Sequence, residues 1–93
     1  MKRAIRIKMK ENSKQSNNPK DIDGFYIDDG QSVLYFSVED LFGFLKNEPS
    51  EIIQIADDTS SSLVPVNATN GKGYIRSIPN RGMIDSLMRL PRE

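Results

Sequence analysis

The sequence predicts an α+β domain, in which a mostly antiparallel sheet of about six strands carries one central helix and one short C-terminal helix. The expected order of elements is β-β-β-α-β-β-β-α. From Ile5 to Met9 apolar and basic residues alternate, which is the period of a half-buried strand. After Ser37 the apolar residues recur three and four positions apart, as on one face of a helix. Turn sequences such as Asn70-Gly71 separate short β-branched runs in the rest of the chain.

The composition indicates one compact domain over 1–93, because a chain of 93 residues supports one hydrophobic core. The absence of Cys and His removes the thiol nucleophile, the imidazole base and the usual zinc ligands. We therefore expect no metal site and no cofactor. Met1-Lys2-Arg3 does not resemble a secretory leader, and no apolar run approaches the roughly 18 residues of a membrane span. A cytoplasmic protein of bacterial type is expected.

The first half of the chain predicts three strands. The first covers about 3–10. The next stretch, 11–20, has no apolar residue and is expected to be a flexible polar loop. Strands over 22–28 and 32–36 follow, joined by a tight turn at Asp28-Asp29-Gly30.

A helix is predicted over 38–47. Ser37 stands three residues before Asp40, as in a capping box with Asp in place of the usual Glu, and Pro49 ends the helix. Phe44 falls at the flank of the apolar stripe and is expected at the margin of the core.

The second half predicts three more strands and a final helix. The strands are expected over about 52–56, 63–68 and 74–78, with Pro65 favouring an edge or a bulge. The final helix is expected over 83–90, before Pro91.

The formal charge is zero, yet it is unevenly distributed: 1–20 carries +6, 21–58 carries −9 and 59–93 carries +3. The favoured interpretation is that basic and acidic strands lie side by side and neutralise each other. The alternative is a basic face for a polyanion, built from Arg6, Lys8 and Lys10. That alternative needs a continuous positive patch with an exposed Tyr or Phe beside it.

No motif in the chain is specific for a reaction. Gly71-Lys72-Gly73 lacks the spacing of a phosphate-binding loop. The pairs Asp28-Asp29 and Asp57-Asp58 would form a metal site or an acid/base pair only if the two turns met, so solvated turn aspartates are the favoured interpretation.

The last twenty residues carry a family resemblance. Tyr74-Ile75-Arg76-Ser77, then Asn80, Asp85-Ser86-Leu87-Met88 and Leu90-Pro91 resemble the C-terminal signature of the small bacterial family called domain of unknown function 3892. Ser77 and Ser86 depart from the usual Thr and Asn. The resemblance implies a domain identity without a biochemical role.

Within this signature, Arg76 and Asp85 have opposite charges and lie a short loop apart in sequence. A contact between them that stabilises the fold is the favoured interpretation. A ligand site made of Arg76, Asn80 and Asp85 is the alternative.

The favoured function is a non-catalytic binding or protein-interaction module. Its partner is expected to be an unknown protein or small molecule and not a membrane, and a homodimer is compatible with the sequence. Two alternatives stay open. One is nucleic-acid binding through the basic first strand, and the other is a small enzyme or metal site that uses pooled aspartates. The first needs the basic and aromatic patch, and the second needs a concave site where carboxylates converge.

Overall fold

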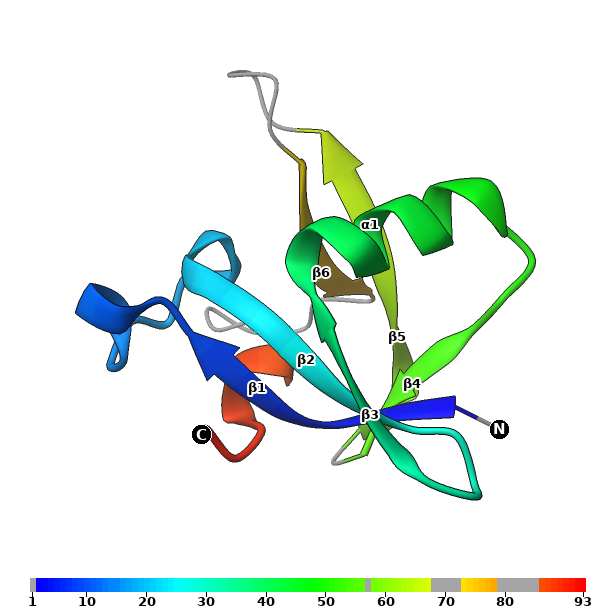
Figure 1. The fold of residues 1–93 in the computed structure, drawn as a ribbon, viewed down its shortest axis with the longest axis horizontal. Helices are drawn as coiled ribbons and strands as arrows, with labels where there is room; N and C mark the ends of the chain where they lie inside the picture. The colour runs from blue at the N-terminus through cyan, green and yellow to red at the C-terminus, as the bar shows by residue number, and fades with distance from the viewer. Residues whose placement is uncertain (1, 57, 68–72, 79–85) are drawn as a thin grey trace.

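The structure, a computed structural model, describes residues 2–56, 58–67, 73–78 and 86–93 (Figure 1). These residues form six strands, one α-helix and three short 3-10 helices. In chain order they are β1 (Lys2–Met9), η1 (Glu11–Ser13), η2 (Pro19–Asp21), β2 (Ile22–Asp28), β3 (Val33–Ser37), α1 (Val38–Asn47), β4 (Ile53–Ile55), β5 (Asp58–Asn67), β6 (Gly73–Ile78) and η3 (Ser86–Arg89).

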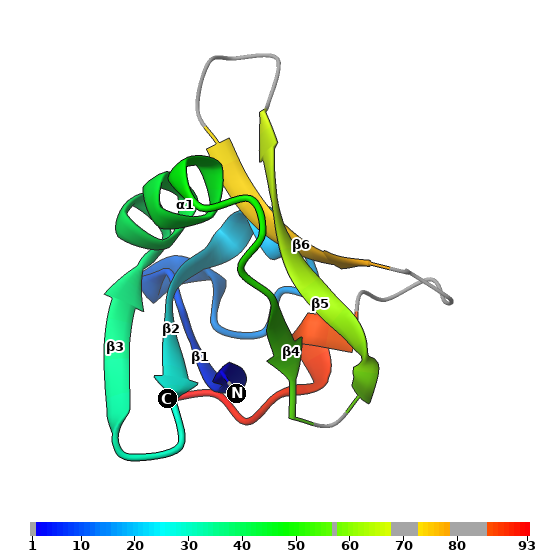
Figure 2. The ribbon, with the colours of Figure 1, turned by 90° about the vertical axis from the view of Figure 1, so that its right-hand side faces the viewer.

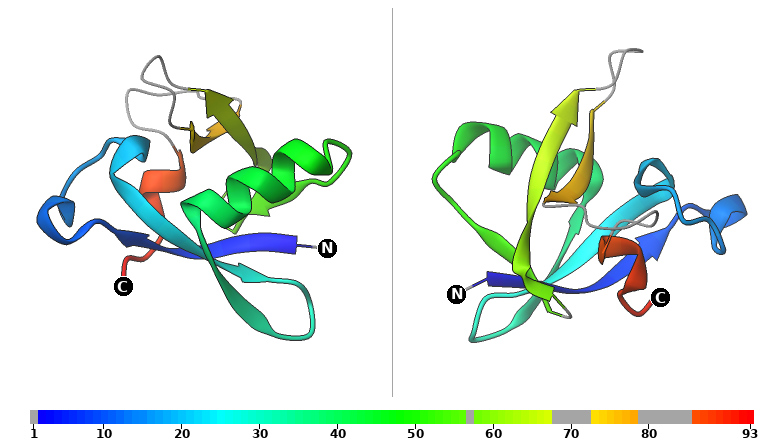
Figure 3. Two further views of the ribbon diagram at one scale, coloured as in Figure 1. Left: turned by 45° about the horizontal axis from the view of Figure 1, so that its top comes forward. Right: turned by 180° about the vertical axis from the view of Figure 1, so that it is seen from behind.

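The strands form one sheet in the order β3-β2-β1-β4-β5-β6, which confirms the predicted α+β class. Neighbouring strands are antiparallel except β1 and β4, which run parallel. Helix α1 contacts both β3 and β6, although these strands stand at opposite edges of the sheet. The sheet therefore curls around the helix, as Figure 2 and Figure 3 show.

The first strand separates an inner from an outer face, although its alternation is interrupted. Ile7 pairs with Phe25, and both side chains are buried, whereas Arg6 pairs with Tyr26 and is exposed. The register shifts between Ala4 and Arg6, so Ala4 and Ile7 both lie in the core although they are three residues apart. The strict alternation predicted from the sequence is thus wrong at Ile5, which is half-buried.

The open side of β1 is shared by two segments. β4 pairs with Lys2–Ala4, and the chain end pairs further along, at Ile7. There the Ile7 N–H donates to the Pro91 carbonyl at 3.0 Å, and the Glu93 N–H donates to the Ile7 carbonyl at 3.0 Å. The C-terminus is thereby attached to the middle of the sheet.

The predicted C-terminal helix is only a 3-10 turn, η3, and positions 83–85 lie outside the described residues. The Leu90 N–H donates to the Leu87 carbonyl, three residues back, and Pro91 then begins the extended pairing with β1. Because the Leu90 N–H donates to a carbonyl three residues back and not four, this turn is a 3-10 turn and not an α-helix. Leu87, Met88 and Leu90 are nevertheless buried in the core, as their apolar spacing predicts.

Pro65 occupies the middle of β5, which is not an edge strand of the sheet. The pairing of β4 with β5 ends at Ser62, however, and from Leu63 to Asn67 the recorded partner of β5 is β6. Pro65 therefore lies where β5 is locally an edge, which satisfies the preference of a residue without an N–H.

Helix α1 has the bounds that the sequence predicts. The Asp40 N–H donates to the Ser37 side chain at 3.1 Å, so Ser37 is the N-cap. Leu41 and Leu45 are buried, and Phe44 packs at the core margin, as expected.

The polar segment 11–20 has local structure that its composition does not predict. It contains η1 and the start of η2, and the Lys20 N–H donates to the Asn18 side chain at 3.0 Å. Arg92 reaches this segment from the chain end: its guanidinium donates to the Lys14 carbonyl at 2.7 Å and to Asn17 Oδ1 at 3.3 Å. The flexibility of segment 11–20 stays a prediction.

Candidate functional site

The candidate site is the free edge of the sheet at β3. Val33, Leu34 and Tyr35 are 49%, 47% and 43% exposed, and they follow one another along the chain. Large apolar side chains this exposed are scattered elsewhere, at Ile52 and Ile78 among the described residues. Three in a row on one edge strand form a local apolar surface.

The backbone of β3 also offers hydrogen-bonding groups. The Asp29 N–H donates to the Ser32 carbonyl at 3.1 Å and closes the turn between β2 and β3. Hydrogen-bonded and non-hydrogen-bonded pairs alternate along antiparallel strands. With Val33 opposite Asp28 and Tyr35 opposite Tyr26, the N–H and C=O groups of Val33 and Tyr35 point away from β2. They form a template for a further strand.

The β3 edge lacks the features that protect most free edges. Its five residues, 33–37, include no charged side chain and no Pro, and its pairing with β2 has no irregularity. The opposite edge strand, β6, differs, because it contacts both η2 and η3 and carries Arg76. Helix α1 contacts both edge strands, so among the described residues the two edges differ in these further neighbours of β6 and in charge.

The outer face beside β3 carries two tyrosines and two cations. The rings of Tyr26 and Tyr35 lie 5.1 Å apart between centroids, tilted by 59°. Arg6 lies over the Tyr26 ring at 5.9 Å, and Lys8 lies over the Tyr35 ring at 5.9 Å. The Tyr35 ring covers Gly24, where a Cβ atom would overlap it. Gly24 thus lets this ring lie close to the sheet.

Acidic groups offset the cations on this face. The Tyr26 hydroxyl donates to Glu93 Oε2 at 2.6 Å, and this hydrogen bond is the main cause that raises the pKa of Tyr26. Partial burial raises the pKa of Tyr35, and the negative charge of Asp23 raises it further. The face is therefore mixed in charge. Nucleic-acid binding would need a continuous positive patch beside an exposed aromatic side chain. The aromatic side chains are present on this face, but the acidic groups interrupt the positive patch.

The residues proposed for polyanion contact lie at different places in the fold. Arg6 and Lys8 share the outer face with the tyrosines, whereas Lys10 lies beyond the end of β1 and its backbone N–H donates to the Asp21 carbonyl. At the start of β1, Lys2 forms a partly exposed ion pair with Glu51, whose Oε1 lies 3.5 Å from Lys2 Nζ.

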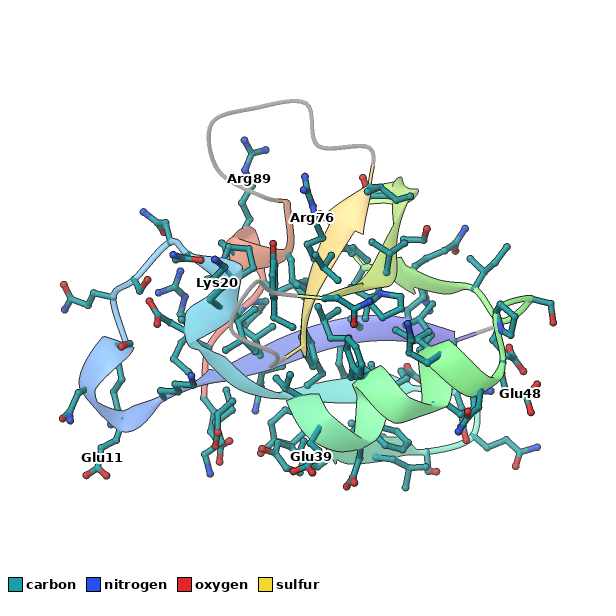
Figure 4. All side chains as sticks on the ribbon, turned by 90° about the horizontal axis from the view of Figure 1, so that it is seen from above. Glu11, Lys20, Glu39, Glu48, Arg76 and Arg89 are labelled. Atoms are coloured by element: carbon teal, nitrogen blue, oxygen red, sulfur yellow. The ribbon has the colours of Figure 1, made fainter. Side chains whose placement is uncertain are left out.

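The predicted site at the C-terminal signature is described only in part, because Asn80 and Asp85 lie outside the described residues. Arg76 lies on β6, and its Nε atom is buried with no hydrogen-bond partner among the described residues. Figure 4 shows Arg76 and Arg89 extending in the same direction. Neither the proposed pairing of Arg76 with Asp85 nor the ligand site is tested.

The aspartates at the β2–β3 turn hold the turn together. Asp28 Oδ1 accepts from the Gly30 N–H at 2.9 Å, and Asp29 Oδ1 accepts from Gln31 and Ser32 at 2.9 Å each. The Ser32 N–H, followed by that of Gln31, lowers the pKa of Asp29. Gly30 has φ +96°, which favours glycine.

Asp57 lies outside the described residues, and Asp58 begins β5. No three Asp, Glu, His or Cys side chains in the described part of the chain form a group that could hold a metal.

Sequence reasoning missed Val33 and Leu34 as site residues. The available signal was the run Val33-Leu34-Tyr35-Phe36, which is apolar throughout although antiparallel strands with one solvent-facing side usually alternate. Such a run indicates a strand with both faces covered. Its position at the edge is visible only from the strand order.

Comparison with known proteins adds no identity: no family model matches the chain, and searches of curated proteins and of solved structures also find no match. No helix in the described ranges is long and apolar enough to cross a membrane.

Proposed function

We propose that this chain is a cytosolic, non-catalytic protein-interaction module that binds an extended polypeptide segment by strand addition at β3. The observation that carries the proposal is the open, uncharged edge at which Val33, Leu34 and Tyr35 are all close to half exposed. Membership of the domain of unknown function 3892 family is compatible with this role and stays a proposal of its own.

Strand addition uses both parts of the edge. The outward N–H and C=O groups of Val33 and Tyr35 would supply the main-chain hydrogen bonds, which provide affinity without selecting a sequence. Side chains of the added strand would alternate between the outer face, beside Tyr35, and the inner face, beside Leu34 and Phe36. Apolar and aromatic side chains of β3 line both sides, Val33 and Tyr35 on the outer side and Leu34 and Phe36 on the inner side, so the module favours segments rich in β-branched and aromatic residues.

The two alternatives have less support. Nucleic-acid binding is favoured by the cations Arg6 and Lys8 beside exposed Tyr35, but Glu93 and Asp23 lie at the same tyrosines. A small enzyme or metal site is not favoured by the turn at Asp28 and Asp29, because Oδ1 of each carboxylate accepts backbone hydrogen bonds within the turn.

The experiment is a selection from a displayed library of random ten-residue peptides. Wild-type protein is the bait. The variant Tyr35→Lys carries a charge on the edge strand, which opposes strand pairing. Peptides that still bind this variant therefore bind elsewhere on the protein and are discarded. The selected peptides should be rich in residues that favour β-strands. When such a peptide is titrated into 15N-labelled protein, the amide signals of residues 33–37 should change chemical shift, and their hydrogen exchange should slow.

The control variant is Ile78→Lys, because Ile78 is 45% exposed but lies on the opposite edge strand. It should bind the selected peptides as tightly as the wild type does, whereas Val33→Lys should lower the affinity for these peptides at least tenfold. Peptides whose amide shifts map to β6 or to the outer face of β1 and β2, or a library without specific binders, would contradict the proposal.

A further inference from the structure

We infer that the segment added at β3 is β3 of a second copy of this chain, paired antiparallel about a twofold axis through Tyr35. This inference rests on the proposed function, and it names the partner of the same edge. The register places Tyr35 opposite Tyr35 of the second copy, Leu34 opposite its Phe36, and Val33 opposite its Ser37.

The register follows from the direction of the backbone groups. Tyr35 has its N–H and C=O pointing outward, so two copies that meet at this residue exchange a pair of hydrogen bonds. Leu34 and Phe36 then face each other as a non-hydrogen-bonded pair, in which side chains approach more closely. In an isologous dimer the same surface of each copy must complement itself. Tyr35 is the middle residue of the five-residue strand and its N–H and C=O groups point outward, so β3 meets this requirement.

The charge of the edge permits pairing with a second copy. Self-pairing places identical residues near each other, so a charged edge would repel its own copy. β3 has no charged side chain, and therefore no like charges face each other across the axis. All three exposed apolar residues of the edge gain a neighbouring strand at once: Val33, Leu34 and Tyr35.

The outer face gives a second argument. Tyr26 and Tyr35 already lie in ring contact across β2 and β3, on one row perpendicular to the strands. The twofold axis extends that row to four tyrosines, because residues directly opposite in paired strands have Cβ atoms about 5 Å apart. Gly24 keeps the Tyr35 ring low on the sheet, so it leaves the edge accessible to the second strand.

The dimer is expected to be weak. A five-residue strand pair covers much less than the roughly 1,200 to 2,000 Å² of a stable interface, so association should appear only at high protein concentration. Sedimentation equilibrium should show a mass that rises from 10.5 kDa towards twice that value as concentration increases. Tyr35→Lys places two ammonium groups at the axis and should hold the chain at the monomer mass, while Ile78→Lys should behave as the wild type.

Cysteine cross-linking tests the register. The natural chain has no Cys, so each single-Cys variant carries one thiol. Tyr35→Cys should form a disulfide-linked dimer on mild oxidation, because the two thiols meet at the axis. Val33→Cys is the matched control on the same edge. Its two copies would stand four residues out of register, roughly 13 Å apart, beyond the limit of about 7 Å between Cα atoms for a disulfide.

The outcomes separate the partner from the function. Concentration-independent monomer mass, or equal cross-linking of the two Cys variants, overturns the second-copy inference. If library peptides still bind at 33–37 in that case, strand addition stands and the natural partner is another protein. Absence of both self-association and peptide binding overturns the inference and the proposed function together.

Discussion

Single residues determine how closely the helix and the sheet approach each other. A Cβ atom on Gly73 would overlap the Phe42 ring, which packs against the core from α1. Because Gly73 has no side chain, the Phe42 ring can pack directly against the backbone at Gly73. Helix α1 and strand β6 are in contact. At Gly43, on α1 itself, the equivalent position is open: no atom lies within 4 Å of it apart from the adjoining residues and the backbone of the helix.

The two glycines provide a matched pair. Gly73→Ala should lower the free energy of unfolding by about 1 to 3 kcal/mol, because the Phe42 ring must move from its site. Gly43→Ala should raise it by roughly 0.5 to 1 kcal/mol, because Ala is the better residue inside a helix. Urea denaturation of both variants measures the difference. Equal effects would show that Phe42 repacks freely.

The hydrogen bond from Tyr26 to Glu93 has a measurable consequence at alkaline pH. It raises the pKa of Tyr26 in the folded protein, so its stabilising contribution is complete below the unfolded value near 10 and is lost as pH rises through the folded pKa. Glu93→Gln should bring the pKa of Tyr26 down towards its ordinary value. Ring chemical shifts of Tyr26 followed by NMR measure this, and an unchanged titration would mean that Glu93 is not the main cause of the raised pKa.

At the scale of elements, the chain end connects β1 with the polar segment 11–20. Arg92 donates to the carbonyls of Lys14 and Met88, at 2.7 and 3.1 Å, and to Asn17. One side chain thus links η3 to the region between η1 and η2. We infer that the order of this region depends on Arg92.

Arg92→Ala should increase fast backbone motion in residues 13–18 and lower stability by about 1 to 2 kcal/mol, since two hydrogen bonds from a charged donor to carbonyls are lost. Heteronuclear NOE values of these amides provide the measurement. Arg89→Ala is the control, because Arg89 is exposed and no hydrogen bond is recorded for its side chain among the described residues. Low NOE values already present in the wild type would show that the segment is flexible despite Arg92.

The sequence predicts elements better than it predicts their neighbours. The cap at Ser37 and the bounds of α1 follow from local rules, and both are confirmed. The parallel pairing of β1 with β4, the pairing of Ile7 with Arg92, and the register shift at Ile5 involve partners far apart in the chain. Periodicity carries no information on such partners, because it reports only which face of an element is buried.

The same reason explains the missed site. The apolar run 33–36 correctly predicts a strand, but an edge and a central strand differ only in what lies beside them. Likewise, the basic alternation of β1 gives Arg6 and Lys8 an exposed face, while the tyrosines and Glu93 beside them come from β2, β3 and the chain end. A surface assembled from four segments is not visible in any one of them.

At the scale of the whole molecule, charge balance sets the behaviour towards nucleic acid. The formal net charge is zero, and the aromatic face that carries Arg6 and Lys8 also carries Glu93. A polyanion that approaches this face meets attraction and repulsion together. Long-range attraction therefore gives little help to association.

Titration with single-stranded and duplex DNA at low salt should accordingly show only weak association. If Arg6 and Lys8 were both to contact phosphates, each would add about 0.7 to the slope of log affinity against log salt concentration for a single strand, so the slope should stay near 1.4 or below. Fluorescence anisotropy over a range of salt concentrations measures this slope.

Micromolar binding with a slope of about 4 or more would contradict this expectation, because it requires some six phosphate contacts. The double variant Arg6→Gln/Lys8→Gln then locates the interaction: loss of binding would identify the tyrosine face as a nucleic-acid surface, and retained binding would place it elsewhere. Glu93→Gln gives the complementary measurement. If its carboxylate repels the polyanion at Tyr26, as the hydrogen-bonded geometry indicates, this variant should bind DNA more tightly than the wild type.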